Sequence, residues 1–112
     1  MGYAVKLSRR AERDLHELYL FLNASNSAAA TRWFNGLETA IYSLERLPRR
    51  SPRTREGRKI RRPLRHLLYG ERPDVYRVIY EIDHSTRTVF ILGVRHGARD
   101  KWNSGEKSER PA

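Results

Sequence analysis

The chain contains no cysteine among its 112 residues, which excludes disulfides, thiolate metal sites and a cysteine nucleophile. No apolar run approaches the roughly 20 residues that a membrane-spanning helix needs. The first seven residues also lack the apolar core of a signal peptide. From these absences we expect a cytoplasmic protein that makes no use of a membrane.

Several signatures of catalysis are missing as well. The sequence has no phosphate-binding glycine loop, no dinucleotide-binding glycine pattern and no nucleophilic serine elbow. Its carboxylates are scattered rather than clustered as Mg²⁺ requires, and its histidines lack the spacing of a zinc site. We therefore expect no metal and no other cofactor, and two-metal nuclease chemistry is disfavoured.

Acidic residues are few compared with basic ones. The chain has 23 Lys and Arg against 13 Asp and Glu, a formal net charge of +10. The range 49–66 holds eight arginines, one lysine and one glutamate, so a net +8 is concentrated in one connector and the strand that follows it. Such a charge predicts a polyanionic partner: nucleic acid, an anionic membrane or an acidic protein.

The apolar residues follow two periodicities, and together they predict the fold. Ser8 has the character of a helix N-cap, and Leu47-Pro48 is expected to end the second helix. Spacings of three and four predict two helices, and alternation predicts four strands. The expected strands cover 3–7, 64–68, 75–82 and 88–94. The first expected helix covers 9–23, and the second has an apolar stripe from Ala30 to Leu44.

This order, β-α-α-β-β-β, predicts an α+β fold. A loop of about four residues makes the two helices an antiparallel hairpin, packed on one face of a small, twisted, mainly antiparallel sheet. We expect a single domain over residues 1–102. Residues 103–112 have no periodicity and are expected to form a disordered tail.

Alternation also assigns faces to the last two strands. Arg77 and Arg95 are expected on a bare face, with Arg65 beside them if Leu64 and Leu68 point inward. The connector 49–62 is expected to approach this face. The residues assigned to the helix-covered faces are Tyr76, Val78, Tyr80, Ile82, Phe90, Leu92 and Val94.

An arginine-bearing face is suited to phosphate, because the guanidinium donates paired hydrogen bonds and keeps its charge. His66 and His96 stand beside basic residues at strand ends, where like charge lowers the pKa and permits a neutral base near pH 7. The competing interpretations are a solvated charged loop, strand arginines paired with Glu81 or Asp83, and a His96 that only caps the core.

Arg, Lys and His suffice for one reaction on RNA. The 2′-OH attacks its own phosphate, which requires a base, cations around the developing charge and an acid for the leaving 5′-oxygen. A metal-free ribonuclease is therefore one hypothesis. A basic RNA-binding module without activity is another.

Four segments in order carry a family resemblance: 11–15 (AERDL), 44–48 (LERLP), 75–82 (VYRVIYEI) and 94–100 (VRHGARD). Over roughly residues 3–102 the chain resembles the RelE/ParE superfamily of bacterial type II toxin–antitoxin toxins. The resemblance implies a growth-arresting toxin held by a cognate antitoxin, which we expect to be acidic. Its RelE branch implies ribosome-dependent mRNA cleavage without metal, and its ParE branch implies inhibition of DNA gyrase.

The resemblance also implies residue roles. In the RelE branch the functional arginine of the Tyr-Arg-x-x-Tyr strand falls on Arg77. Trp102 stands near the position of a functional tyrosine in many RelE-like toxins, and the ending His-Gly-Ala-Arg-Asp also occurs among ParE-like sequences. The expected catalytic residues are Arg77, Arg95, His96, Arg65 and His66. The expected RNA-binding residues are Arg58, Lys59, Arg61, Arg62 and Arg99.

The combined expectation is a mRNA-cleaving toxin, with gyrase inhibition and plain RNA binding as alternatives. Because Arg77 is expected on a bare face, Arg77→Ala is expected to remove toxicity and leave the fold intact.

Overall fold

The computed structural model describes residues 2–97, and its centre is one four-stranded sheet in the order β1-β4-β3-β2. Strand β1 runs parallel to β4, and the other two pairs are antiparallel. The predicted α+β class is confirmed, as is the three-stranded antiparallel meander. The strands are β1 (Ala4–Leu7), β2 (Arg65–Tyr69), β3 (Tyr76–Asp83) and β4 (Thr88–His96). The predicted tail 103–112 lies outside the described residues.

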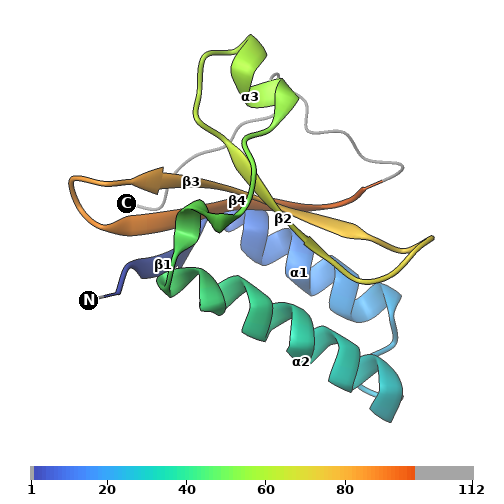
Figure 1. The fold of residues 1–112 in the computed structure, drawn as a ribbon. Coiled ribbons are helices and arrows are strands. Elements are labelled where there is room, and N and C mark those ends of the chain that lie inside the picture. Colours follow the sequence, from blue (N-terminus) through green and yellow to red (C-terminus); the bar gives the residue numbers. More distant parts are fainter. Residues whose placement is uncertain (1, 98–112) are drawn as a thin grey trace.

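Two helices, α1 (Arg9–Phe21) and α2 (Ala28–Tyr42), lie side by side on one face of the sheet (Figure 1). Ser8 caps α1 as predicted, since its hydroxyl oxygen accepts from the Ala11 amide at 3.0 Å. Beyond α2 the chain continues as two 3₁₀ turns, η1 (Ser43–Glu45) and η2 (Pro48–Arg50). The helical hairpin is thus confirmed, although the α-helix itself ends at Tyr42.

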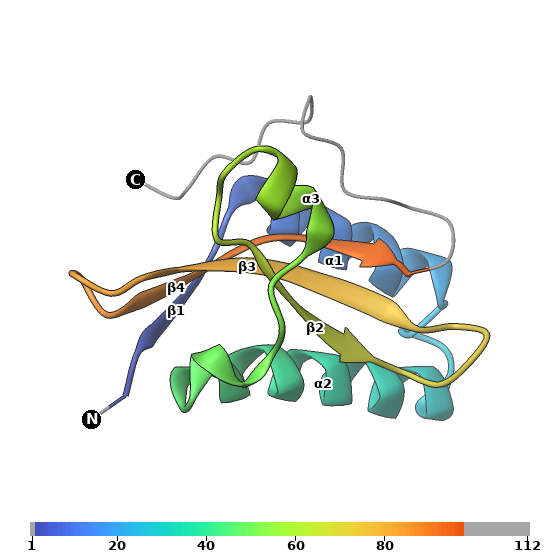
Figure 2. The same ribbon diagram turned by 45° about the horizontal axis from the view of Figure 1, so that its top comes forward.

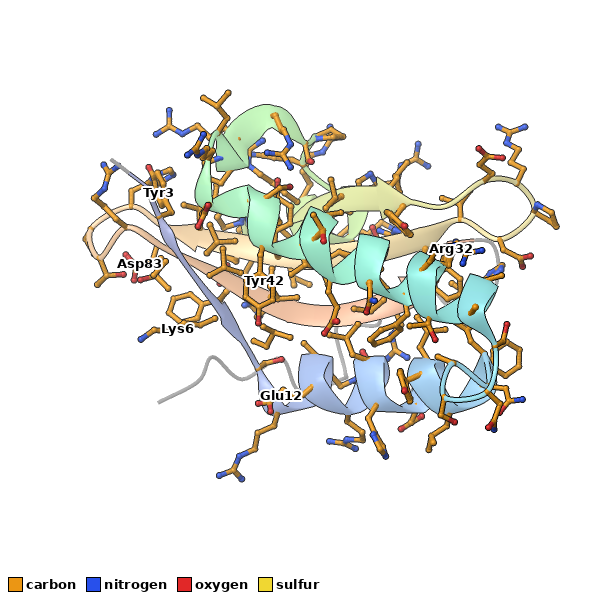
Figure 3. All side chains as sticks on the ribbon, turned by 90° about the horizontal axis from the view of Figure 1, so that it is seen from below. Tyr3, Lys6, Glu12, Arg32, Tyr42 and Asp83 are labelled. Atoms are coloured by element: carbon orange, nitrogen blue, oxygen red, sulfur yellow. The ribbon has the colours of Figure 1, made fainter. Side chains whose placement is uncertain are left out.

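The main hydrophobic core lies between this hairpin and the sheet. Leu37, Ile41 and Leu44 are fully buried there against Val78 and Tyr80 of β3. Seen from the helix side, the two helices cover the sheet, and charged residues such as Glu12 and Arg32 lie on their solvent side (Figure 3).

A β-bulge in β4 changes the face that its residues occupy. Ile79 pairs with Gly93 but Tyr80 pairs with Ile91, so Leu92 is the extra residue of the ladder. Val94 faces the helices as predicted. The assignment of Phe90 and Leu92 to the helix side is wrong, because alternation cannot be carried across an inserted residue. Both lie in a second core on the opposite face.

That opposite face is covered rather than bare, contrary to the expectation. The connector forms a short helix, α3 (Arg55–Lys59), which lies across the sheet from the hairpin (Figure 2). Thr54 caps it through a hydrogen bond from the Gly57 amide at 2.9 Å. Leu64 and Ile79, both fully buried, form the second core beneath it with Phe90, Leu92 and the partly buried Ile60. The arginine-rich connector is therefore a folded element.

None of the helices within residues 2–97 is both long enough and apolar enough to cross a membrane.

Candidate site on the α3 face

The candidate site lies where α3 and the loop after it meet β3. On this face β3 presents Arg77, as predicted, and Ile79 and Glu81 follow it in alternation. The connector matches them with an acidic, an apolar and a basic contact, provided by Glu56, Leu64 and Arg62. Two ion pairs therefore flank the second core, and β3 and the connector each supply one cation and one anion to them.

The first ion pair joins Arg77 to Glu56 through two parallel hydrogen bonds. Nη1 of Arg77 donates to Oε2 at 2.8 Å, and Nη2 donates to Oε1 at 3.0 Å. The Arg77 side chain is only 10% exposed and that of Glu56 is 25% exposed. This is the end-on geometry in which guanidinium also binds phosphate. The pairing of Arg77 with Glu81 or Asp83, weighed from the sequence, is not the one observed.

The second ion pair joins Arg62 to Glu81. Nε of Arg62 donates to one carboxylate oxygen at 3.2 Å, and Nη2 donates to the other at 3.0 Å. The Glu81 side chain is 5% exposed, so its charge needs a cation close by, and Arg62 provides one. Arg62 thus has a structural partner and does not stand open to solvent like the other basic residues of the connector.

His66 is the third member of the Arg77 cluster. The strand register places it across from Ile79, on the α3 face, and Nε of Arg77 donates to its Nδ1 at 3.1 Å. Burial lowers the pKa of His66, the Arg77 charge lowers it further, and Glu56 offsets part of this. For His66 this is the direction expected of a histidine among cations, with burial rather than like charge as the larger cause.

Of the other predicted catalytic residues, one lies beside Arg77 and two do not. Arg95 is directly across the β3–β4 ladder from Arg77, as predicted. Arg65 is across from Tyr80 instead, and its guanidinium donates to the carbonyl of Ser51 at 2.7 Å. The expectation that Arg65 joins the arginine face is wrong, because Leu64 and Leu68 point toward that face rather than toward the helices.

His96 also belongs to the helix side of the sheet. Its ring packs edge-on against Tyr76 with centroids 5.1 Å apart, and its Nε2 lies 3.3 Å from a carboxylate oxygen of Asp74. The strand register pairs Tyr76 with His96, one position beyond the Arg77–Arg95 pair. His96 therefore closes the end of the core and does not meet His66.

Three of the basic residues expected to bind RNA lie on the helix that carries Glu56 or directly after it. Arg58, Lys59 and Arg61 are exposed on α3 and the turn that follows it, as are Arg53 and Arg55. Within residues 2–97 these five form no ion pair. Arg99 and Trp102 lie outside the described residues.

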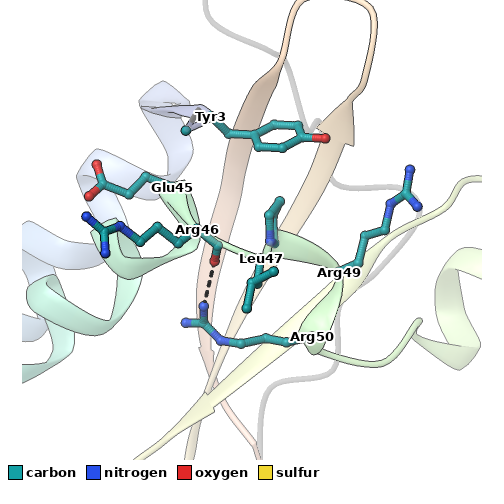
Figure 4. A pocket seen from close by; sticks show the side chains of 8 residues that line it. Tyr3, Glu45, Arg46, Leu47, Arg49 and Arg50 are labelled. Atoms are coloured by element: carbon teal, nitrogen blue, oxygen red, sulfur yellow. Dashed lines mark hydrogen bonds between the residues drawn. The ribbon is translucent and has the colours of Figure 1, made fainter.

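A groove of about 800 Å³ opens elsewhere, between the N-terminal edge and the η1–η2 turns (Figure 4). Leu47, 78% exposed, lies in it beside Tyr3, Arg46 and Arg49. Arg50 also lines it, with its guanidinium bound to the Arg46 carbonyl at 2.9 Å. None of the groove's lining residues belongs to the α3-face cluster. In the described part of the chain, no three His, Asp or Glu side chains are grouped to hold a metal ion.

Glu56 is the site residue that the sequence reasoning missed. It is the only acidic residue in a stretch of nine basic ones, and this isolation was an available signal. A lone carboxylate in such a stretch is favoured where it has a specific cation to hold. Its partner, however, is 21 residues away on another element, and only the fold brings the two together.

The chain thus combines a helical hairpin on one face of a four-stranded sheet with a short basic helix on the other. The family model for the ParE toxin of type II toxin–antitoxin systems matches residues 5–101. The chain therefore belongs to the RelE/ParE family of type II toxins, and the resemblance seen in the sequence is confirmed.

Individual relatives agree with this family. Toxin RelG from Mycobacterium tuberculosis is 35% identical over 98 residues, which is 88% of this chain and 94% of that protein. The RelBE2 toxin–antitoxin complex from the same organism contains a chain with 29% identity and a TM-score of 0.55, covering 88% of this chain and 94% of that one. A mutant of E. coli toxin RelE in the free state shares the fold, with 17% identity, a TM-score of 0.59 and coverage of 88% and 86%.

Proposed function

We propose that this toxin is a ribosome-dependent endoribonuclease that cleaves mRNA without a metal and so blocks translation. The observation that carries the proposal is the contact between His66 and Arg77 on a face surrounded by exposed cations. The exposed basic residues of α3 would hold the RNA backbone, since phosphate contacts supply most of the affinity of such surfaces.

The chemistry assigned to the cluster is charge stabilisation. Attack by the 2′-OH on the adjacent phosphate forms the 2′,3′-cyclic phosphate and breaks the bond to the 5′-oxygen. The 2′-hydroxyl proton passes to solvent water and the 5′-oxygen takes a proton from solvent water, while negative charge grows on the non-bridging oxygens. Arg77 and Arg95 are neighbours across the β3–β4 ladder, which supports a role for both in stabilising that charge. Because Arg65 and His96 lie on the helix side, the proposed site comprises Arg77, His66 and Arg95.

The proposal is tested with purified toxin, translating ribosomes and a defined mRNA. We expect new 3′ ends carrying a cyclic phosphate, and we expect His66→Ala to reduce their rate of formation by about 10²-fold or more. Arg13→Ala removes an exposed arginine from α1, on the other side of the sheet, and serves as the matched control for loss of charge. Intact mRNA in the presence of active toxin would contradict the nuclease.

The exposed basic residues of α3 and the turn after it are tested separately. Arg58→Ala with Arg61→Ala should weaken binding to ribosomes and reduce the salt dependence of that binding, because two phosphate contacts are lost. Arg13→Ala with Arg9→Ala removes the same charge from exposed positions of α1 and should leave both properties unchanged. Equal losses from the two pairs would mean that only net charge matters.

The second candidate function is inhibition of DNA gyrase without nuclease activity. The specific observation in its favour is that the matching family model is that of the ParE toxins. Induction in growing cells separates the two functions: a nuclease stops amino-acid incorporation first, whereas a gyrase inhibitor stops DNA synthesis and leaves translation running.

We also propose an acidic antitoxin as the partner, because relatives of this chain are found in a toxin–antitoxin complex and the chain carries a net charge of +10. Opposite charge accelerates association, so the association rate should fall as salt is raised. An association rate that does not change with salt would argue against electrostatic attraction to the 49–66 segment.

A further inference from the structure

Three side chains on the α3 face form a chain of hydrogen bonds in which Arg77 is the central member. Its Nη1 and Nη2 donate to the two oxygens of Glu56, and its Nε donates to Nδ1 of His66. The Arg77 side chain is 10% exposed, so its orientation is fixed by these contacts rather than by water. Glu56 therefore orients Arg77, and Arg77 in turn contacts His66.

The donor in the contact with His66 determines where the imidazole proton lies. A guanidinium does not lose its protons at any ordinary pH, so Nε of Arg77 is always a donor. Nδ1 of His66 must then present its lone pair, and the neutral ring carries its proton on Nε2. A protonated ring would direct an N–H of Nδ1 at the N–H of Arg77, an arrangement that repulsion disfavours.

We propose that Glu56 is a positioning residue that, through Arg77, holds His66 as a neutral donor with its proton on Nε2. This inference rests on the proposed function and gives it a specific form. His66 donates a hydrogen bond to an oxygen of the RNA phosphate and does not act as the general base that its position among cations suggested. No proton leaves the ring, so the positive charge of Arg77 and the Nε2–H stabilise the phosphate together.

The opposite role for Glu56 is also chemically possible and predicts the opposite result. Glu56 occupies the two N–H groups with which Arg77 would otherwise bind a phosphate end-on. As a cover it would have to move away before RNA binds, and its removal would then increase activity. The positioning role is favoured because the same carboxylate orients Arg77, whose Nε lies 3.1 Å from Nδ1 of His66.

The test compares Glu56→Gln with Glu71→Gln. Both variants make the same change in charge and shape, but Glu71 is exposed in the β2–β3 turn. The first measurement is the nitrogen chemical shifts of the His66 ring by NMR, at a pH well above its ordinary pKa, assigned by their loss in His66→Asn. The second measurement is the rate of mRNA cleavage on translating ribosomes.

In the wild type and in Glu71→Gln we expect the Nδ1 signal of an unprotonated nitrogen and the Nε2 signal of a protonated one. In Glu56→Gln the two signals should move toward each other as both tautomers become populated. Cleavage should fall by roughly tenfold to a hundredfold, as for a misplaced catalytic contact. Glu56→Asp keeps the charge on a shorter side chain and should recover part of both properties.

Each other outcome is decisive. A wild-type ring protonated on Nδ1 overturns the inference without any variant. Unchanged signals and rate in Glu56→Gln overturn it too, and faster cleavage makes Glu56 a cover. If the signals respond as expected but the wild type cleaves no RNA, the positioning of His66 stands and the nuclease proposal fails.

Discussion

Removing the Arg77 side chain should destabilise the fold as well as reduce activity, because Arg77 is buried beneath α3 in an ion pair with Glu56. Breaking a buried ion pair costs about 3–5 kcal/mol, mainly because the partner is left as an uncompensated charge. Here the stranded Glu56 carboxylate is 25% exposed and reaches water in part. We therefore expect Arg77→Ala to lower the free energy of unfolding by about 2–3 kcal/mol.

The reverse truncation should cost more. Glu56→Ala strands the Arg77 guanidinium, which is 10% exposed and less able to find water. We expect the free energy of unfolding to fall by about 3–4 kcal/mol. The double variant should lose less than the sum of the two single losses. The difference, the coupling energy of the pair, should be about 1–3 kcal/mol.

The assay is equilibrium urea unfolding of the wild type, the two single variants and the double variant, at one pH and salt concentration. A domain of this size has about 5–15 kcal/mol of stability, so all four should remain folded in buffer. Single losses and a coupling energy below about 0.5 kcal/mol would show a solvent-screened surface pair and refute the reasoning. The stability of Arg77→Ala must therefore be known before its toxicity is interpreted.

Three further predictions concern other buried groups. Since the folded state lowers the pKa of His66, the unfolded state binds the imidazole proton more readily. The free energy of unfolding should therefore be highest above the ordinary pKa of 6.5 and fall as the pH drops through it. His66→Asn should make the urea midpoint depend less on pH between about pH 5 and 8. Burial raises the pKa of Asp14, although its carboxylate accepts a hydrogen bond from the Val94 amide at 2.9 Å. Asp14→Asn keeps an acceptor and removes the charge, so the free energy of unfolding at neutral pH should stay the same or rise. A loss above about 1 kcal/mol would contradict this. Leu64→Ala should cost about 2–4 kcal/mol by calorimetry or urea, whereas a loss below about 1 kcal/mol would mean that the second core contributes little.

Local signals in the sequence were sufficient for most of the fold. Ser8 caps α1, the 3.6-residue stripe locates both helices, and β-branched residues locate β3 and β4 within two residues of their ends. These features depend on contacts between near neighbours in the chain. They could therefore be read without knowing which strands pair.

The errors arise where the outcome depends on distant segments. The bulge at Leu92 moves Phe90 to the other face, and it shows only in the pairing of β4 with β3 around Ile79. The orientation of β2 is likewise set by its pairing, which turns Arg65 toward Tyr80 and His66 toward the α3 face. A strand pattern gives alternation but not its phase, and a phase error exchanges every side chain between faces.

The folding of the connector follows from the same long-range contacts. Residues 49–66 repel one another in isolation, and their few apolar members cannot form a core by themselves. On the sheet, Ile60 and Leu64 meet an apolar patch of β3 and β4, while the two ion pairs compensate Glu56 and Glu81. These contacts orient the segment so that its remaining cations face solvent on α3. The same arrangement that stabilises the connector thus presents the charge that a polyanionic target would bind.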